Sequence, residues 1–136
     1  MLPFQIARAL LLQDSAVSAL VPAGAIGPVP LPAGAVPGLG LLLLDASRDG
    51  LVDDQPAGEL WQAQLQITCT AGTFEAALHL AQAVERALDR RNGAVPGVPA
   101  VHLVSLVLGR YGPHGFDTDR SAWEQPVDFS LTYQPL

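Results

Sequence analysis

The sequence contains few charged residues and no lysine. Charged side chains make up 15% of its 136 residues, the formal net charge is −6, and all seven basic residues are arginines. Only Arg90 and Arg91 are adjacent. Binding to a phosphate backbone needs clustered basic side chains, so this composition argues against direct nucleic-acid binding. It is compatible with an acidic wall that repels passing DNA.

Cysteine and long apolar runs are also scarce. The single cysteine, Cys69, excludes a disulfide scaffold within the chain. Residues 1–6 lack the basic start and continuous apolar core of a signal peptide, and no stretch approaches the roughly 18–20 apolar residues of a membrane span. We therefore expect a soluble protein without a membrane partner, cytosolic where it is made.

The usual patterns of catalysis and metal binding are missing. No serine lies in a Gly-x-Ser-x-Gly elbow, and Cys69 shares the apolar face of its segment, which predicts core packing. His79, His102 and His114 have no paired ligand spacing, and the acidic loops lack the spaced Asp/Asn pattern with its closing glutamate. The sequence predicts no catalytic residue, no metal and no cofactor.

Apolar residues, by contrast, are plentiful. They make up 49% of a chain whose length suits one domain over residues 1–136. Such a surplus fits either an alanine- and leucine-rich core or a surface covered by a partner, and composition leaves both open.

The clearest local signal is a strand followed by a helix. From Trp61 to Thr70 every odd position is apolar and every even one is Gln or Thr, as in a strand with one buried face. Apolar residues then recur at three- and four-residue spacing over 74–88. Thr73 can cap this helix, and we expect Asn92-Gly93 to supply the left-handed residue that stops it.

The remaining elements are placed around this unit. We expect a helix over residues 3–13, a short one to Leu20, and an edge strand over 26–29 in a proline- and glycine-rich segment. The apolar run 39–45 predicts a strand buried on both faces or covered by a neighbour, followed by a polar connection over 46–58. Further strands are expected over 101–108 and 126–134, joined by a turn over 110–123. The fold class predicted is α+β: an antiparallel sheet of about four strands with two helices packed on its apolar face.

Aromatic residues gather in the predicted last turn. Tyr111, Phe116 and Trp123 lie there beside Arg110. Such residue types are enriched at interface hot spots, although they could equally cover the open end of the core. Arg110 is a candidate for an ion pair with the acidic loop of a second subunit. The candidate subunit or tube interface is therefore Asp49, Asp53, Asp54, Arg110, Tyr111, Phe116 and Trp123.

Several segments together resemble a known family. In chain order they are Leu-Leu-Gln-Asp-Ser-Ala-Val-Ser-Ala-Leu-Val (11–21), Ile-Gly-Pro (26–28), Pro-Ala-Gly-Ala-Val-Pro (32–37), the Leu-x-Leu strand, an Asp-Gly loop, Trp-x-x-x-Leu-Gln-Ile (61–67), Thr-Phe-Glu-Ala-Ala-Leu-x-Leu-Ala-x-Ala-Val (73–84) and Val-Asp-Phe-Ser-Leu-Thr-Tyr (127–133). Their order and spacing resemble the tail terminator, or tail completion, proteins of long-tailed bacteriophages over nearly the whole chain. Two departures concern subunit contacts more than the fold: Gly38-Leu39 replaces a polar or aromatic residue, and the turn after the fourth strand has few charges.

The resemblance implies a structural virion protein without catalysis. It implies a ring, typically a hexamer, at the head-proximal end of the tail tube, which stops tube polymerisation and joins the tail to the head connector. The implied partners are copies of the chain, the tail tube protein and the head-tail connector protein. DNA would pass through the lumen without specific binding, and assembly would take place in the host cytoplasm. Part of the loop from Asp45 to Glu59 is expected to line or abut the channel or tube.

Two rival interpretations stay open at this stage. One is a small ligand-binding or enzymatic α+β domain, as a monomer or a dimer, with a cleft between the early proline-rich loop and the sheet. The other is a different neck protein, such as a head-completion or adaptor component.

Overall fold

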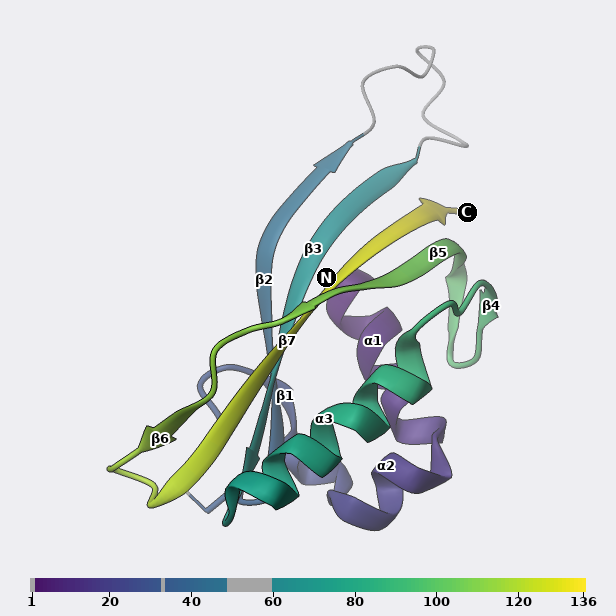
Figure 1. Ribbon diagram of the computed structural model, residues 1–136. Coiled ribbons are helices and arrows are strands. Elements are labelled where there is room, and N and C mark those ends of the chain that lie inside the picture. The colour runs from purple at the N-terminus through teal and green to yellow at the C-terminus, as the bar shows by residue number, and fades with distance from the viewer. Residues whose placement is uncertain (1, 33, 49–59) are drawn as a thin grey trace.

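The computed structural model describes residues 2–32, 34–48 and 60–136. A sheet forms one layer and the helices form a second layer against it (Figure 1). In chain order the elements are α1 (Leu2–Gln13), α2 (Ser15–Leu20), a 3-10 turn (Ala23–Ala25), β1 (Ile26–Pro28), β2 (Gly38–Arg48), β3 (Trp61–Ala71), α3 (Phe74–Leu88), β4 (Gly93–Val95), β5 (Val98–Tyr111), β6 (Gly115–Asp117) and β7 (Ala122–Pro135).

The sheet has seven strands in the order β1-β2-β3-β7-β5-β4, with β6 paired to β7. The α+β class is as predicted, but the expected count of about four strands is too low. The long strands β2, β3, β5 and β7 are the four that the sequence indicates, and they pair antiparallel. β1 lies at an edge, as predicted, but it pairs parallel to β2. Strands of three residues, such as β4 and β6, are too short to show a period.

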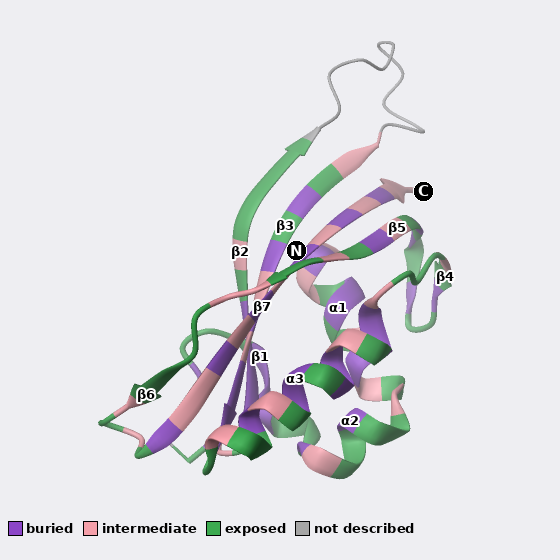
Figure 2. Cartoon of the chain, in the orientation of Figure 1, coloured by how far each residue is buried: buried purple, intermediate pink, exposed green. Residues whose placement is uncertain are grey.

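The core lies between the sheet's inner face and the helices (Figure 2). Leu65 and Ile67 of β3 and Phe129 of β7 are fully buried there, at about 1.5–3 kcal/mol of transfer free energy for each such side chain. Cys69 is also fully buried, as its place on the apolar face predicts. Burial raises the pKa of the Cys69 thiol, which keeps it in the unreactive protonated form.

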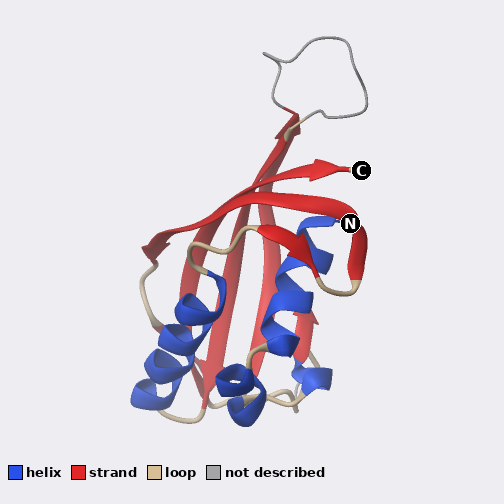
Figure 3. Ribbon diagram, turned by 90° about the vertical axis from the view of Figure 1, so that its right-hand side faces the viewer, coloured by secondary structure: helices blue, strands red, loops and turns tan. Residues whose placement is uncertain are grey.

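The described residues form three α-helices, one more than the two expected on the apolar face, and all three cover the same face of the sheet (Figure 3). The predicted break between the first two is confirmed, because Asp14 caps α2 by accepting a hydrogen bond from the Val17 N–H at 3.0 Å. Thr73 caps α3 in the predicted way, with its hydroxyl 3.1 Å from the Ala76 nitrogen. No helix in the described part of the chain is long and apolar enough to cross a membrane.

The predicted end of α3 is wrong. The helix ends at Leu88, its C-cap Asp89 is extended, and Arg90 takes the left-handed conformation with φ 67°. Gly93 also has positive φ, but it already begins β4. The cause is tertiary, because the Arg90 N–H donates to the Leu106 carbonyl of β5 at 2.7 Å and so draws the chain out of the helix.

Strand boundaries differ from the prediction in a consistent direction. β2 continues through Arg48, where the sequence suggested a loop from Ala46, because residues 45–48 pair with residues 61–64 of β3. The predicted turn over 110–123 contains the end of β5, all of β6 and the start of β7. A strand that contains polar residues is therefore hard to recognise from the sequence, because its hydrogen bonds to a neighbouring strand stabilise it and not an apolar pattern of its own.

Candidate interface surfaces

Arg110 and the acidic loop were expected to meet across a subunit boundary. Asp49, Asp53 and Asp54 lie outside the described residues, as does the rest of the predicted loop from 49 to 59, whereas Asp45 belongs to β2. The Arg110 Nε atom lies 3.3 Å from Asp128 Oδ2 within the same chain. The Arg110 side chain is still 72% exposed, so its ion pair leaves most of the guanidinium in solvent.

Tyr111 has a partner inside the chain. Its hydroxyl donates to Glu85 Oε1 of α3 at 2.7 Å, and its ring packs against the core. Burial first, and then the hydrogen bond and charge of Glu85, raise the pKa of Tyr111. This residue therefore fastens α3 to β5.

Trp123 joins the start of α3 to the β6–β7 hairpin. Its ring centroid lies 5.8 Å from that of Phe74 and 5.3 Å from that of Phe116, both in edge-on geometry. His114 completes the cluster, 4.7 Å from Phe74. Trp123 is partly buried by these contacts, and its interface role stays a prediction. Phe116 remains 50% exposed.

On the face of the sheet away from the helices, which no described helix covers, the centre is polar. Gln66 Nε2 donates to Asp128 Oδ1 at 3.1 Å, and the Ser130 hydroxyl donates to Gln64 Oε1 at 2.9 Å. Cross-strand hydrogen bonds of this kind join β3 to β7 where no helix covers them. Hydrogen bonds within the chain thus hold these side chains in place.

Exposed aliphatic side chains flank that polar centre. Leu42 and Leu44 of β2 are 39% and 50% exposed, and Val107 of β5 is 50% exposed (Figure 2). Leu42 lies opposite Gln66 and Val107 opposite Ser130, which places both on the outer face. The sequence missed them because the run 39–44 has no polar alternation to reveal an outward side. Its alternative of a strand buried on both faces is wrong within this chain.

The predicted cleft between the early loop and the sheet exists but is small. It has a volume of about 170 Å³, below the roughly 300–1,000 Å³ of ordinary ligand pockets. Arg120 spans it, donating to the Leu31 carbonyl at 2.6 Å and lying 3.7 Å from Asp117. Burial first, and then the charge and hydrogen bond of Asp117, raise the pKa of Glu124 against the opposing effect of Arg120. These contacts of Arg120 hold the early proline-rich loop against the β6–β7 hairpin.

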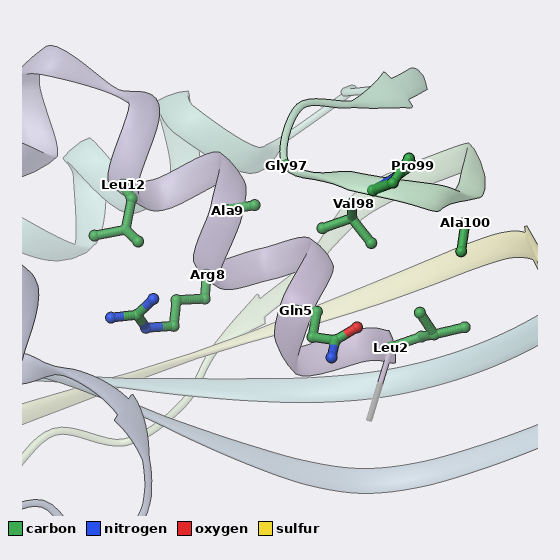
Figure 4. Close-up of a pocket in the computed structure, with 9 residues that line it drawn as sticks. All are labelled: Leu2, Gln5, Arg8, Ala9, Leu12, Gly97, Val98, Pro99 and Ala100. Atoms are coloured by element: carbon green, nitrogen blue, oxygen red, sulfur yellow. The ribbon is translucent and has the colours of Figure 1, made fainter.

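A larger pocket of about 400 Å³ lies between α1 and the turn that joins β4 to β5 (Figure 4). Leu2, Ala9 and Val98 line it with aliphatic groups. The Arg8 guanidinium is already engaged, since Nε donates to the Ile26 carbonyl at 3.0 Å. Within the described part of the chain, no group of three or more His, Cys, Asp or Glu side chains is placed to hold a metal ion.

A chain of similar fold occurs among the solved structures, and the likeness extends along almost the entire chain. It is a chain of the virion of a native gene transfer agent particle, and the TM-score is 0.62 at 20% sequence identity. The match covers 94% of this chain and 91% of that chain. No protein-family model and no curated protein matches the sequence. The likeness shows that the two chains share a fold.

Proposed function

We propose that this chain is a structural virion protein, a ring-forming tail terminator that caps the head-proximal end of a phage-like tail tube. The observation that carries the proposal is the shared fold with a virion chain, because the match extends over nearly the full length of both chains. The sequence motifs that resemble tail terminators point independently to the same class of protein.

Contacts between subunits of a ring would also bury the exposed apolar side chains. In a closed head-to-tail ring every copy contributes two different surfaces. Leu42 and Leu44 on β2 and Phe116 on β6 are separate apolar features that such contacts would bury. The net charge of −6 suits a channel through which DNA passes without adhering. In this role the protein stops tube polymerisation, joins the tail to the head connector and catalyses no reaction.

Another neck component, such as a head-completion or adaptor protein, is the second candidate. It is favoured by the same virion likeness. The two roles differ in the surface that the ring caps: a terminator binds the end of the tail tube, and an adaptor binds the head connector.

The proposal is tested by the mass of the purified full-length chain in solution. A terminator ring is expected to give one closed species, six times the chain mass of 14.2 kDa, and an annulus in electron micrographs. The measurement should be repeated over a wide range of protein concentration, since ring assembly depends on mass action. A monomer or dimer at every concentration, with a saturable small-molecule ligand, would instead support the ligand-binding interpretation.

A further inference from the structure

The exposed side of α3 differs in charge between its two ends. Glu75 is exposed in the first turn, whereas Arg86 is exposed in the last turn and Arg90 and Arg91 are exposed just beyond the helix. These arginines are three of the seven basic residues in a chain whose net charge is −6. A helix of 15 residues is about 22 Å long. The acid and the arginines therefore belong to opposite sides of the subunit.

The side chain of Arg90 projects into solvent from a backbone conformation that favours glycine. Its φ is 67°, which costs free energy for a residue with a side chain. Its N–H donates to the Leu106 carbonyl at 2.7 Å, which fixes the backbone there. The Arg90 side chain is nevertheless 90% exposed, with Nε 3.8 Å from Asp89 Oδ2. Because glycine would fit this φ without strain, the turn itself does not account for an arginine at this position.

The acidic side chains beside these arginines are engaged within the chain. Glu85 and Asp89 already accept hydrogen bonds from residues of β5, at 2.7 and 2.9 Å. Arg86 and Arg91 each donate to a carbonyl of α3 through Nε. A guanidinium has five N–H donors, and both side chains are exposed, so most of their donor capacity remains for a second molecule. The arginine surface consists of Arg86, Arg90 and Arg91.

The start of α3 lies beside exposed aromatic and acidic side chains. Phe116 is 50% exposed and packs on Trp123, which in turn contacts Phe74 in the first turn of α3. The carboxylates of Glu75 and of Asp119, in the turn between β6 and β7, are exposed at this end. In Figure 1 this end lies at the lower left, and the end of α3 lies to the right beside β4. The aromatic-acidic surface consists of Glu75, Phe116 and Asp119.

We propose that the arginine surface of one subunit binds the aromatic-acidic surface of a second copy of this chain. This inference rests on the proposed ring and names its subunit contact. The two surfaces lie at opposite ends of α3, so the contact is heterologous, and a heterologous contact generates a ring when its rotation closes. Each subunit then uses both surfaces, one toward each neighbour.

Charge complementarity favours a second copy as the occupant. Arginine pairs with carboxylates through its planar fork and stacks on aromatic rings, and the second surface offers both kinds of group. A symmetric dimer through either surface would instead place like charges against each other. DNA is disfavoured on the arginine surface, because the net charge of −6 opposes a phosphate backbone.

The contact is tested with two charge-reversed variants of the full chain. One carries Arg86→Glu with Arg90→Glu, and the other carries Glu75→Arg with Asp119→Arg. Alone, each variant opposes like charges at every contact, so it should stay monomeric at concentrations at which the unsubstituted chain forms rings. An equimolar mixture restores opposite charges throughout. Native mass spectrometry should then find rings that contain the two variants in equal numbers.

The matched control mixes either variant with the unsubstituted chain. Any ring that included the variant would contain a like-charge contact, so the variant should be excluded from the rings that form. Circular dichroism of each variant alone shows whether its monomer is folded.

The single variant Arg90→Gly gives a second readout. Glycine adopts the positive φ of this position without strain, so the monomer should keep its resistance to urea. The protein concentration needed for half-maximal ring assembly should rise at least about tenfold, as for loss of a hot-spot side chain. Unchanged assembly of this variant would contradict the proposed contact.

The outcomes separate this contact from the proposed function. Rings of the unsubstituted chain, with none in the mixture of the two variants or with rings of either variant alone, would overturn the contact and leave the function standing. Binding of duplex DNA that Arg90→Gly abolishes without any effect on the ring would also overturn it. Absence of any ring of the unsubstituted chain would count against the function itself, and the contact would fall with it.

Discussion

At the residue scale, the fold depends on side chains that cap helices and on others that join segments far apart in the chain. Asp14 and Thr73 each cap a helix by accepting a hydrogen bond from a backbone N–H three residues ahead, a local contact that the sequence indicates. Arg120 bonds to Leu31, which lies 89 residues away, and nothing near either residue indicates that contact. The sequence also does not indicate the contacts that Tyr111 and Trp123 make with Glu85 and Phe74 of α3, and the interface role of these two residues stays a prediction.

Glu124 gives a pH-dependent prediction at this scale. Burial and the neighbouring Asp117 raise its pKa in the folded chain. The folded chain therefore holds this proton more tightly than the unfolded chain does. The contribution of Glu124 to the free energy of unfolding is greatest below the ordinary glutamate pKa of about 4.3 and is lost as pH rises through the folded pKa.

We expect the substitution Glu124→Gln to increase the free energy of unfolding at pH 7, because the neutral amide avoids the cost of ionising this site. The gain should shrink steadily as pH falls toward about 4, where the native carboxyl is itself protonated. Urea unfolding of both proteins across this pH range measures the effect. A constant difference at all pH values, or a loss of stability at pH 7, would contradict the assigned cause.

At the scale of elements, the period of apolar residues predicts a strand correctly where one face of that strand is buried and the other is exposed to water. Over residues 63–69 of β3 and 127–133 of β7 the alternating apolar residues are the buried ones, as predicted. β2 carries four consecutive leucines, so the pattern could not show that Leu42 and Leu44 face outward. The end of α3 was missed because a hydrogen bond to β5 competes with the Asn-Gly stop signal.

The segment that follows α3 carries a prediction of its own. Replacing Asp89 by alanine removes the acceptor of the Leu108 N–H and leaves a partly buried donor without a partner. The expected loss is about 1–3 kcal/mol in the free energy of unfolding. Hydrogen exchange at the Leu108 amide should also become faster.

The matched control is Asp89→Asn, whose amide oxygen can accept the same hydrogen bond. It should retain most of the amide protection at Leu108 and most of the stability. Equal losses in the two variants would contradict this account, because they would assign the contribution of Asp89 to its charge beside Arg90, 3.8 Å away, and not to the hydrogen bond that closes the β5 edge.

At the scale of the whole molecule, the sequence indicated the α+β class and the pairing of a one-sided sheet with one-sided helices. It could not show that one sheet edge is closed by Asp89 and Arg90 while β2 beyond Leu41 stays open within the described residues. That asymmetry depends on contacts between segments far apart in the chain.

The central claim is tested most directly by locating this chain in the intact particle of the genome that encodes it, by cryo-electron microscopy of the head-tail junction. We predict a single ring of copies between the last ring of the tail tube and the head connector. A particle that lacks the chain, or one that carries it along the length of the tube, would contradict this account.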